Sequence, residues 1–384
     1  MHFPGSLKSK LHNTGTTIFT TMSALAAEHN AINLSQGFPD FPVSEKLISL
    51  VNKNMKAGHN QYSPMAGYMP LREAIAEKVN HLYSAAYDPE KEITITAGGT
   101  QAIYAAIASI INDGDEVIVF DPAYDCYAPA IRLNGGIPVQ IQLKGPEFHI
   151  DWNEVKKMVN QRTRMIMINT PHNPTGSILS AKDMHQLEKI TDKRDIVVLS
   201  DEVYEHVIFD GYEHQSVTRY PKLAERSFVV FSFGKTMHAT GWKIGYCLAP
   251  ENLMSEFRKV HQYMVFCANT PIQRALADYM KDPKHYTELS GFYQEKRDYF
   301  LKLLKGSKFK PLPCHGSYFQ LLDYSKITDE KDTDYAIRLT KENGVASIPI
   351  SVFYKNNVDN KLLRFCFAKE KETLEKAAEK LIEV

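Results

Sequence analysis

Hydrophobic and polar positions along the middle of the chain predict helices and strands in turn. Residues 71–82 carry apolar side chains at helical spacing, and the short apolar run 92–96 predicts a strand. Further helices are expected at 98–111 and 181–191, and further strands at 115–120, 138–142, 164–169, 195–200 and 227–231. Val- and Ile-rich strands that alternate with helices predict an α/β fold, with a mostly parallel sheet of about seven strands covered by helices on both faces.

The pattern changes in the last third of the chain. Helices are expected at 253–264, 271–280, 284–304 and 371–382, and strands at 317–322 and 362–367. This segregation predicts a smaller α+β domain. Residues 1–45 contain Gly37, Pro39 and Pro42 and are expected to be irregular and to pack onto that domain. We therefore expect a large domain over 46–282 and a small domain made of 1–45, as an N-terminal arm, plus 283–384.

Length and charge narrow the class of protein. The 384 residues correspond to about two and a half domains of roughly 150 residues. Lys and Arg total 45, as do Asp and Glu, so the net charge is zero. This balance argues against a nucleic-acid partner, although a local cationic pocket for a small anion stays possible.

Membrane and secretory signals are not evident in the sequence. No run approaches the roughly 18 apolar residues of a membrane span, and the first residues do not resemble a signal peptide. The five cysteines are widely spread without a CxxC pair. We expect a cytoplasmic protein with reduced thiols and no membrane partner.

A lysine that follows an apolar strand is the first candidate for chemistry. Lys235 comes just after residues 228–231, where the carboxyl end of a strand would border a ligand crevice. A desolvated lysine there is an amine nucleophile that can form a Schiff base with a carbonyl compound. Ser232 and Lys243 lie three residues before and eight after it, which suggests an anion site beside the amine. The alternative is an ordinary surface lysine in a loop.

Three further segments follow predicted strands. Asp201 follows the strand at 195–200, and its carboxylate is either a helix N-cap or an electrostatic partner for a ligand. Gly98 and Gly99 open a helix whose amides and dipole favour a phosphate, although many strand–helix turns use paired glycines. Asn173 stands in an Asn-Pro-Thr-Gly turn that has a purely structural interpretation as well.

Other cofactor classes lack their motifs. The histidines form no HExxH or other metal-ligand spacing, so we expect no metal site. The sequence contains neither GxGxxG opening a helix nor GxxxxGK[ST], which excludes the usual nicotinamide and P-loop nucleotide sites.

These motifs, in this order, resemble the class I/II aminotransferases of fold type I, which depend on pyridoxal phosphate. The similarity extends from residues 33–42 to 364–369. Trp242-Lys243, where most of the class has arginine, resembles the branch of methionine aminotransferase, kynurenine aminotransferase and glutamine transaminase K. The resemblance implies that Lys235 holds the cofactor and transfers protons, with Asp201 against the ring nitrogen and Tyr204 near the 3′-oxygen.

The resemblance also assigns the remaining site residues. Ser232, Lys243, Gly99, Thr100 and Gln101 would surround the phosphate, Tyr124 would stack on the ring, and Asn173 would reach the 3′-oxygen. Tyr62 would bind the phosphate of a neighbouring subunit, which implies a homodimer with shared active sites. Arg364 and Asn173 would bind the substrate α-carboxylate, with Gly37, Phe38, Ile18 and Phe266 near the rest of the substrate.

The function implied is ping-pong transamination between an L-amino acid and a 2-oxo acid. Apolar and aromatic candidates around the substrate favour donors such as methionine, phenylalanine, tyrosine, kynurenine or glutamine. Three alternatives stay open: a β-lyase acting on cysteine conjugates at the same site, a cofactor-binding regulator and a catalytically silent structural protein. The regulator would need an added DNA-binding domain, for which the matching region, starting by residue 33, leaves no room.

Overall fold

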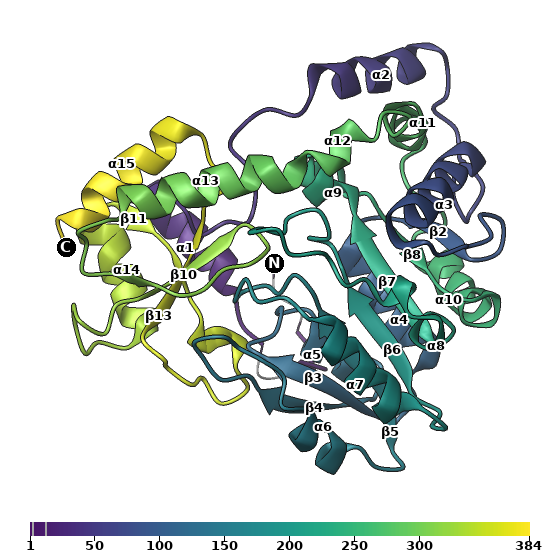
Figure 1. Cartoon of the computed structure of the whole chain (residues 1–384), viewed down its shortest axis with the longest axis horizontal. Coiled ribbons are helices and arrows are strands. Elements are labelled where there is room, and N and C mark those ends of the chain that lie inside the picture. Colours follow the sequence, from purple (N-terminus) through teal and green to yellow (C-terminus); the bar gives the residue numbers. More distant parts are fainter. Residues whose placement is uncertain (2–3, 12–13) are drawn as a thin grey trace.

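A central sheet of seven strands runs through the larger part of the computed structural model, which describes residues 1, 4–11 and 14–384 (Figure 1). The strand order is β2-β8-β7-β6-β5-β3-β4. The strands are β2 (Ile93–Thr96), β3 (Glu116–Asp121), β4 (Ile137–Gln142), β5 (Thr163–Asn169), β6 (Val197–Asp201), β7 (Ser227–Ser232) and β8 (Gly245–Leu248). Strand β8 runs antiparallel to both of its neighbours, β2 and β7, and the other neighbouring strands of this sheet are parallel. The predicted α/β fold with a mostly parallel sheet is therefore confirmed.

Alternate residues of the central strands face two separate hydrophobic layers. In β3, Val117 and Val119 belong to one buried cluster, whereas Ile118 and Phe120 belong to the other. The first layer is closed by α4 (Gly99–Ile110), α5 (Tyr127–Leu133) and α10 (Glu251–Met264). The second is closed by α3 (Met69–Tyr83), α6 (Trp152–Met158), α7 (Ala181–Thr191), α8 (Pro221–Ala224) and α11 (Thr270–Tyr279). Burial on both faces explains why these strands read as continuous apolar runs.

The smaller part of the molecule contains two further sheets, at the left of Figure 1. One has the order β12-β13-β10-β9, and the other pairs β1 with β11. The strands are β1 (Ile32–Asn33), β9 (Lys310–Pro311), β10 (Phe319–Asp323), β11 (Val345–Ala346), β12 (Ile348–Pro349) and β13 (Leu362–Cys366). The surrounding helices are α12 (Lys284–Thr287), α13 (Leu289–Leu303), α14 (Asp332–Glu342) and α15 (Lys371–Ile382). The domain boundaries at 46 and 282 stay predictions.

The expectation of an irregular segment over residues 1–45 is wrong. Helix α1 (Ile18–Glu28) forms there, and α2 (Glu45–Lys56) begins at the end of the segment. The side chain of Thr17 caps α1 by accepting a hydrogen bond from the Thr20 amide, and Met22 and Ala26 of α1 are buried. The helix buries one face against α14. Gly37, Pro39 and Pro42, which favour irregular structure, lie after the helix and do not interrupt it.

Other element boundaries agree closely with the pattern of the sequence. Helices α7 and α15 coincide with the predicted 181–191 and 371–382. The helix expected over 284–304 is divided into α12 and α13, with Glu288 between them. Among the described residues, no helix is both long and apolar enough to cross a membrane.

Candidate active site

One cavity of about 230 Å³ opens where the carboxyl ends of β5, β6 and β7 meet the first turn of α4. The carboxyl edge of a parallel sheet is the usual place for a ligand in open α/β folds. Strands β10 and β13 of the smaller part contribute Phe319 and Arg364 to its wall. The predicted site residues that line this cavity are Gly37, Gly99, Thr100, Tyr124, Asn173, Asp201, Tyr204, Ser232, Lys235, Lys243 and Arg364.

Lys235 lies in the short helix α9 (Phe233–Thr236), directly after β7. Its Nζ donates hydrogen bonds to the Gly37 carbonyl over 3.0 Å and to the Tyr318 hydroxyl over 2.8 Å. Burial lowers the pKa of Lys235 to about 8; the nearby Cys366 opposes this shift. A larger fraction of the amine is therefore neutral and nucleophilic near neutral pH than for an exposed lysine.

Asp201 ends β6, and the in-register pairing of the strands sets it opposite Asn169 of β5. The Tyr127 hydroxyl donates to Asp201 Oδ2 over 2.5 Å, and the Val203 amide donates to Oδ1 over 3.3 Å. Burial raises the pKa of this carboxyl to about 6, while the hydrogen bond from Tyr127 opposes the shift. Asp201 is thus a buried carboxylate whose charge a cationic ligand group would stabilise.

The opposite end of the cavity has the character of an anion site. No side chain caps the amides of the first turn of α4, and Gly98 before them adopts a φ of +85°. A Cβ at Gly98 would lie 3.5 Å from Nζ of Lys243, and Ser232 lines the same end of the cavity. Free helix amides, a hydroxyl and an ammonium are a suitable set of donors for a phosphate.

Arg364 projects from β13 and is only 1% exposed. It donates to the Asn173 side-chain oxygen over 2.7 Å and to the Ser35 carbonyl over 3.0 Å, and both partners are neutral. The buried Nε has no partner among the described residues, and the guanidinium carbon lies 3.8 Å from the centroid of the Phe319 ring. A buried guanidinium with neutral partners favours the binding of a carboxylate.

Asn169 connects the loop of Asn173 with the end of β6. Its side chain donates to the Asp201 carbonyl over 2.8 Å and accepts from the Asn173 amide over 2.9 Å. The residue that contacts Arg364 and the strand that carries Asp201 are therefore held in a fixed relative position.

Five of the predicted residues do not line the cavity in this single chain. The Gln101 side chain accepts a hydrogen bond from the Ala97 amide and faces His261, so only the Gln101 backbone is near the predicted phosphate position. Phe38 is 43% exposed, and Ile18 packs against the hydrophobic core. Tyr62 is 82% exposed, and its ring contacts the Phe266 ring edge-on at 5.2 Å. The roles assigned to these residues stay predictions.

The sequence pattern missed several residues that surround the candidate groups. Tyr127 and Tyr318 contact Asp201 and Lys235, and Phe19, Gln36 and Phe319 line the cavity. Phe19 is adjacent in sequence to Ile18, so the sequence predicts the correct segment at the cavity but the neighbouring side chain. Nothing in the local sequence around Tyr318 indicates a contact with a residue 83 positions away.

Titratable clusters elsewhere do not form a metal site. Among residues 1, 4–11 and 14–384, no group of three or more His, Cys, Asp or Glu side chains is arranged to hold a metal ion. The five cysteines are unpaired.

A mostly parallel sheet with a lysine and a carboxylate after adjacent strands defines the class of fold-type I transferases. The chain belongs to the class I and II aminotransferases, since the model of that family matches residues 29–381. It is 50% identical over 375 residues to methionine aminotransferase of Escherichia coli K12, with 97% of each chain covered. Human kynurenine–oxoglutarate transaminase 1 is 32% identical, with 93% of each chain covered.

Structural comparison agrees with the sequence comparison. The structure of YbdL from Escherichia coli, whose reactivity identified a methionine aminotransferase function, superposes with a TM-score of 0.97 at 49% identity. The match covers 99% of this chain and all of the other. The fold and the enzyme class predicted from the sequence, an aminotransferase, are therefore confirmed.

Proposed function

We propose that this aminotransferase moves the amino group of an apolar, sulfur-containing or aromatic L-amino acid to a 2-oxo acid, with pyridoxal phosphate held at Lys235. The observation that carries the proposal is the convergence of Lys235, Asp201 and Arg364 on one cavity. These three residues supply an amine, a buried carboxylate and a carboxylate-binding guanidinium. The names of the similar methionine and kynurenine enzymes support this class of donor.

The residues present fit pyridoxal phosphate. The amides of Gly99 and Thr100, with Ser232 and Lys243, would hold the phosphate, and Asp201 would face the ring nitrogen. Tyr124 would lie against the ring, and Asn173 and Tyr204 would be near its 3′-oxygen. When bound, the cofactor supplies an aldehyde for the substrate amine and a protonated ring that accepts electron density from the α-carbon.

Each half-reaction depends on a proton carried by Lys235. Its neutral amine would take the proton from the substrate α-carbon and return it on the cofactor side, as general base and then acid. Asp201 would keep the proton on the ring nitrogen. The first 2-oxo acid leaves before the second binds, which gives ping-pong kinetics.

Arg364 and Asn173 would bind the α-carboxylate, so substrate selection depends on the rest of the wall. This wall has aromatic surfaces, supplied by Phe19, Phe319 and Tyr124. Among the described residues, Arg364 is the only arginine that lines it. An apolar side chain therefore finds a better environment than the carboxylate of aspartate. Apolar pockets discriminate by only about 1–3 kcal/mol per methylene, so several donors are expected.

The assembly we propose is a homodimer with shared active sites, in the cytoplasm. Tyr62 and Tyr263, at 82% and 91% exposed, are large apolar side chains on the surface, and Met264 and Phe266 nearby are also exposed. Such a cluster is a candidate interface. The free cysteines are in keeping with a reducing compartment.

The function is tested with purified protein, pyridoxal phosphate and a 2-oxo acid acceptor. Methionine, phenylalanine, tyrosine, kynurenine, glutamine and aspartate serve in turn as donors, and the amino acid formed from the acceptor is quantified. We expect product with several apolar or aromatic donors and none with Lys235→Ala. Product only with aspartate would overturn the proposed donor class, and absence of product with every donor would overturn the proposal.

The lyase alternative is not favoured by the comparisons, because the similar proteins are transaminases. A cysteine conjugate incubated without any acceptor distinguishes the two activities. Release of pyruvate at a rate above that of transamination would indicate the lyase.

Dimerisation with shared sites is tested by mixing two inactive variants. Lys235→Ala keeps Tyr62, and Tyr62→Ala keeps Lys235. If Tyr62 serves the neighbouring site, hybrid dimers contain one site with both residues intact, and mixing restores part of the activity. A sedimentation profile of monomers would contradict the proposed assembly.

A further inference from the structure

Lys235, Tyr318 and Gly37 form a closed triangle of hydrogen bonds. Lys235 Nζ donates to the Tyr318 hydroxyl over 2.8 Å and to the Gly37 carbonyl over 3.0 Å. The Tyr318 hydroxyl donates to the same carbonyl over 2.5 Å. A carbonyl oxygen has two lone pairs and can accept both bonds.

In this triangle the Tyr318 hydroxyl donates to Gly37 and accepts from Lys235. The single hydroxyl proton of Tyr318 is used toward Gly37, so the phenol oxygen faces Lys235 as an acceptor. The two acceptor oxygens lie on the same side of Nζ, since they are only 2.5 Å apart, and the N–H bonds of a neutral amine point toward that side. The lone pair of the neutral amine therefore points away from these two oxygens. In the ammonium form, the third N–H occupies that position.

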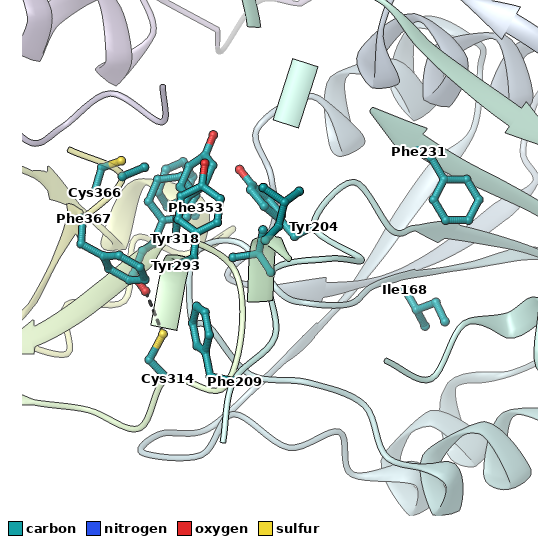
Figure 2. Close-up of a cluster of buried hydrophobic side chains, with 14 of the residues drawn as sticks. Ile168, Tyr204, Phe209, Phe231, Tyr293, Cys314, Tyr318, Phe353, Cys366 and Phe367 are labelled. Atoms are coloured by element: carbon teal, nitrogen blue, oxygen red, sulfur yellow. Dashed lines mark hydrogen bonds between the residues drawn. The ribbon is translucent and has the colours of Figure 1, made fainter. Parts of the chain in front are cut away.

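Tyr318 itself is held rigidly. It is fully buried, its carbonyl accepts from the Phe367 amide over 3.1 Å, and its ring packs edge-on against Tyr204 with centroids 5.0 Å apart. Figure 2 shows Tyr204, Tyr293 and Tyr318 in one cluster of buried side chains. Burial raises the pKa of the Tyr318 phenol well above its usual value, so it stays protonated. It acts on the amine by position and does not exchange a proton with substrate.

Gly37 completes the arrangement because its position tolerates no side chain. A Cβ there would lie 2.7 Å from Cζ of the Phe319 ring. The carbonyl that receives both hydrogen bonds is thereby kept against the strand that follows Tyr318. The Tyr318 carbonyl accepts a hydrogen bond from the segment just after Arg364. Tyr318 therefore contacts both the Lys235 amine and the segment that follows the carboxylate-binding arginine.

We propose that Tyr318 is a positioning residue for the catalytic amine: its hydroxyl, with the Gly37 carbonyl, orients the lone pair of Lys235 and stabilises its protonated form between proton transfers. This inference rests on the proposed role of Lys235. The other ionisable groups that act on Lys235 are Cys366, Arg364, Lys243 and Asp201, and none of them donates to or accepts from its Nζ in the described chain.

The direct test measures the amine in protein freed of cofactor. Competitive labelling with acetic anhydride across pH, followed by mass spectrometry of the peptide that contains Lys235, gives its pKa without any turnover. In Tyr318→Phe, the ring and its packing remain and only the hydroxyl is lost, as acceptor from Lys235 and as donor to Gly37. We expect the pKa of Lys235 to fall by about one unit, because an ammonium gains more from a hydrogen-bond acceptor than an amine does.

Tyr293→Phe is the matched control. Tyr293 is also fully buried and its ring lies 5.6 Å from that of Tyr318, but its hydroxyl pairs with His238 and not with Lys235. The Lys235 pKa should be unchanged in this variant. Equal shifts in both variants, or no shift in Tyr318→Phe, would overturn the proposal. Thermal unfolding of each variant shows whether packing is preserved.

A second readout uses the enzyme loaded with pyridoxal phosphate. Tyr318→Phe should lower kcat about tenfold, the loss expected for one misplaced proton-transfer group, and leave KM for the donor within about twofold. A rise in KM with unchanged kcat would contradict a role at the amine. Absence of turnover in the unmodified protein would instead contradict the proposed function, while the labelling result would still report on Tyr318.

Discussion

Tyr127 donates its hydroxyl proton to Asp201 across 2.5 Å in the buried layer beneath the candidate active site. Tyr127 opens α5, and Asp201 ends β6, 74 residues further along the chain. Burial favours the neutral carboxyl, and this hydrogen bond favours the carboxylate. The charge of Asp201 near neutral pH therefore depends on a tyrosine outside the cavity wall.

Replacement of Tyr127 by phenylalanine should weaken cofactor binding. Without the donor, the pKa of Asp201 rises above its value of about 6, and a smaller fraction is ionised at pH 7. A hydrogen bond to a charged group contributes about 1.5–3 kcal/mol, so the affinity for pyridoxal phosphate should fall roughly tenfold to a hundredfold. Absorbance titration of the cofactor-free protein measures this. Tyr87→Phe is the control, since the buried Tyr87 hydroxyl has no partner within the described part of the chain. Unchanged affinity in Tyr127→Phe would refute the coupling.

The ionisation of Asp201 also gives the cofactor-free protein a specific pH dependence of stability. Burial raises its folded pKa from 3.8 to about 6, so the folded state binds the proton more tightly than the unfolded state. Stability therefore falls as the pH rises through this window, by up to about 3 kcal/mol for a shift of about two units. Asp201→Asn cannot ionise and should escape the loss.

Urea unfolding at pH 4.5 and pH 7.5 checks this, because comparison of the two proteins cancels the contribution of other groups. Cofactor-free Asp201→Asn should be more stable than the unmodified protein at pH 7.5, and this advantage should shrink at pH 4.5. A difference between the two proteins that is independent of pH would rule out the buried carboxylate as its cause.

Gly98→Ala should damage the anion site as well as the local backbone. Gly98 has a φ of +85°, which an alanine adopts only with strain of about 1–3 kcal/mol, and the added methyl would fill space beside the Lys243 ammonium. We expect a loss of stability of this size and at least about tenfold weaker binding of pyridoxal phosphate, since the adjoining amides of α4 shift. Gly114 has the same φ of +85°, but a Cβ there would lie in open space. Gly114→Ala therefore measures the backbone strain alone, without damage to the anion site. Equal affinities in the two variants would place the phosphate elsewhere.

A buried ion pair supports the loop that carries Asp201 and Tyr204. Lys78 of α3 donates to Glu205, which also accepts from the Tyr83 hydroxyl over 2.6 Å. Burial alone would raise the pKa of Glu205, but His206 and Lys78 outweigh it and hold the pKa below its usual value. Lys78→Met should cost up to about 3–5 kcal/mol, because the buried Glu205 carboxylate loses its ammonium partner and keeps only Tyr83 and His206 beside it.

The double variant Lys78→Met/Glu205→Leu should recover part of that loss, since neither charge then remains buried. The free energy of unfolding in urea is the measurement. Lys91→Ala breaks the exposed pair with Glu251 and should change stability by less than about 0.5 kcal/mol. A similar small effect from Lys78→Met would show that water reaches the pair.

The positions and ends of the parallel strands could be predicted because they are local properties of the sequence. Val- and Ile-rich runs bounded by polar residues mark each parallel strand, and the carboxyl ends of β6 and β7 then bring Asp201 and Lys235 to one edge. The local sequence does not predict helix α1, because the helix is stabilised by contacts with α14, more than 300 residues away. The contacts of Tyr127 and Tyr318 could not be predicted either, because their partners are 74 and 83 residues away in the chain.

The side chains around the substrate could not all be assigned from their positions in the sequence. Ile18 and Phe19 are neighbours on α1 and both pack against the core, but only Phe19 of the two also lines the cavity. A helix that was not predicted gives no basis for choosing between them. Tyr62 and Phe266 belong to an outer surface in the single chain, where no sequence pattern indicates what they contact.

The position of Arg364 in the chain has a consequence for synthesis. Its strand, β13, lies between β12 and β10 and comes more than 100 residues after β8, the last strand of the seven-stranded sheet along the chain. Domains fold as they emerge from the ribosome, N-terminal segments first. The seven-stranded sheet, complete by Leu248, can close long before the four-stranded sheet receives its inner strand. During synthesis, all seven strands of the sheet that carries Lys235 and Asp201 therefore leave the ribosome before Arg364 does, and the carboxylate-binding group joins the site only after them.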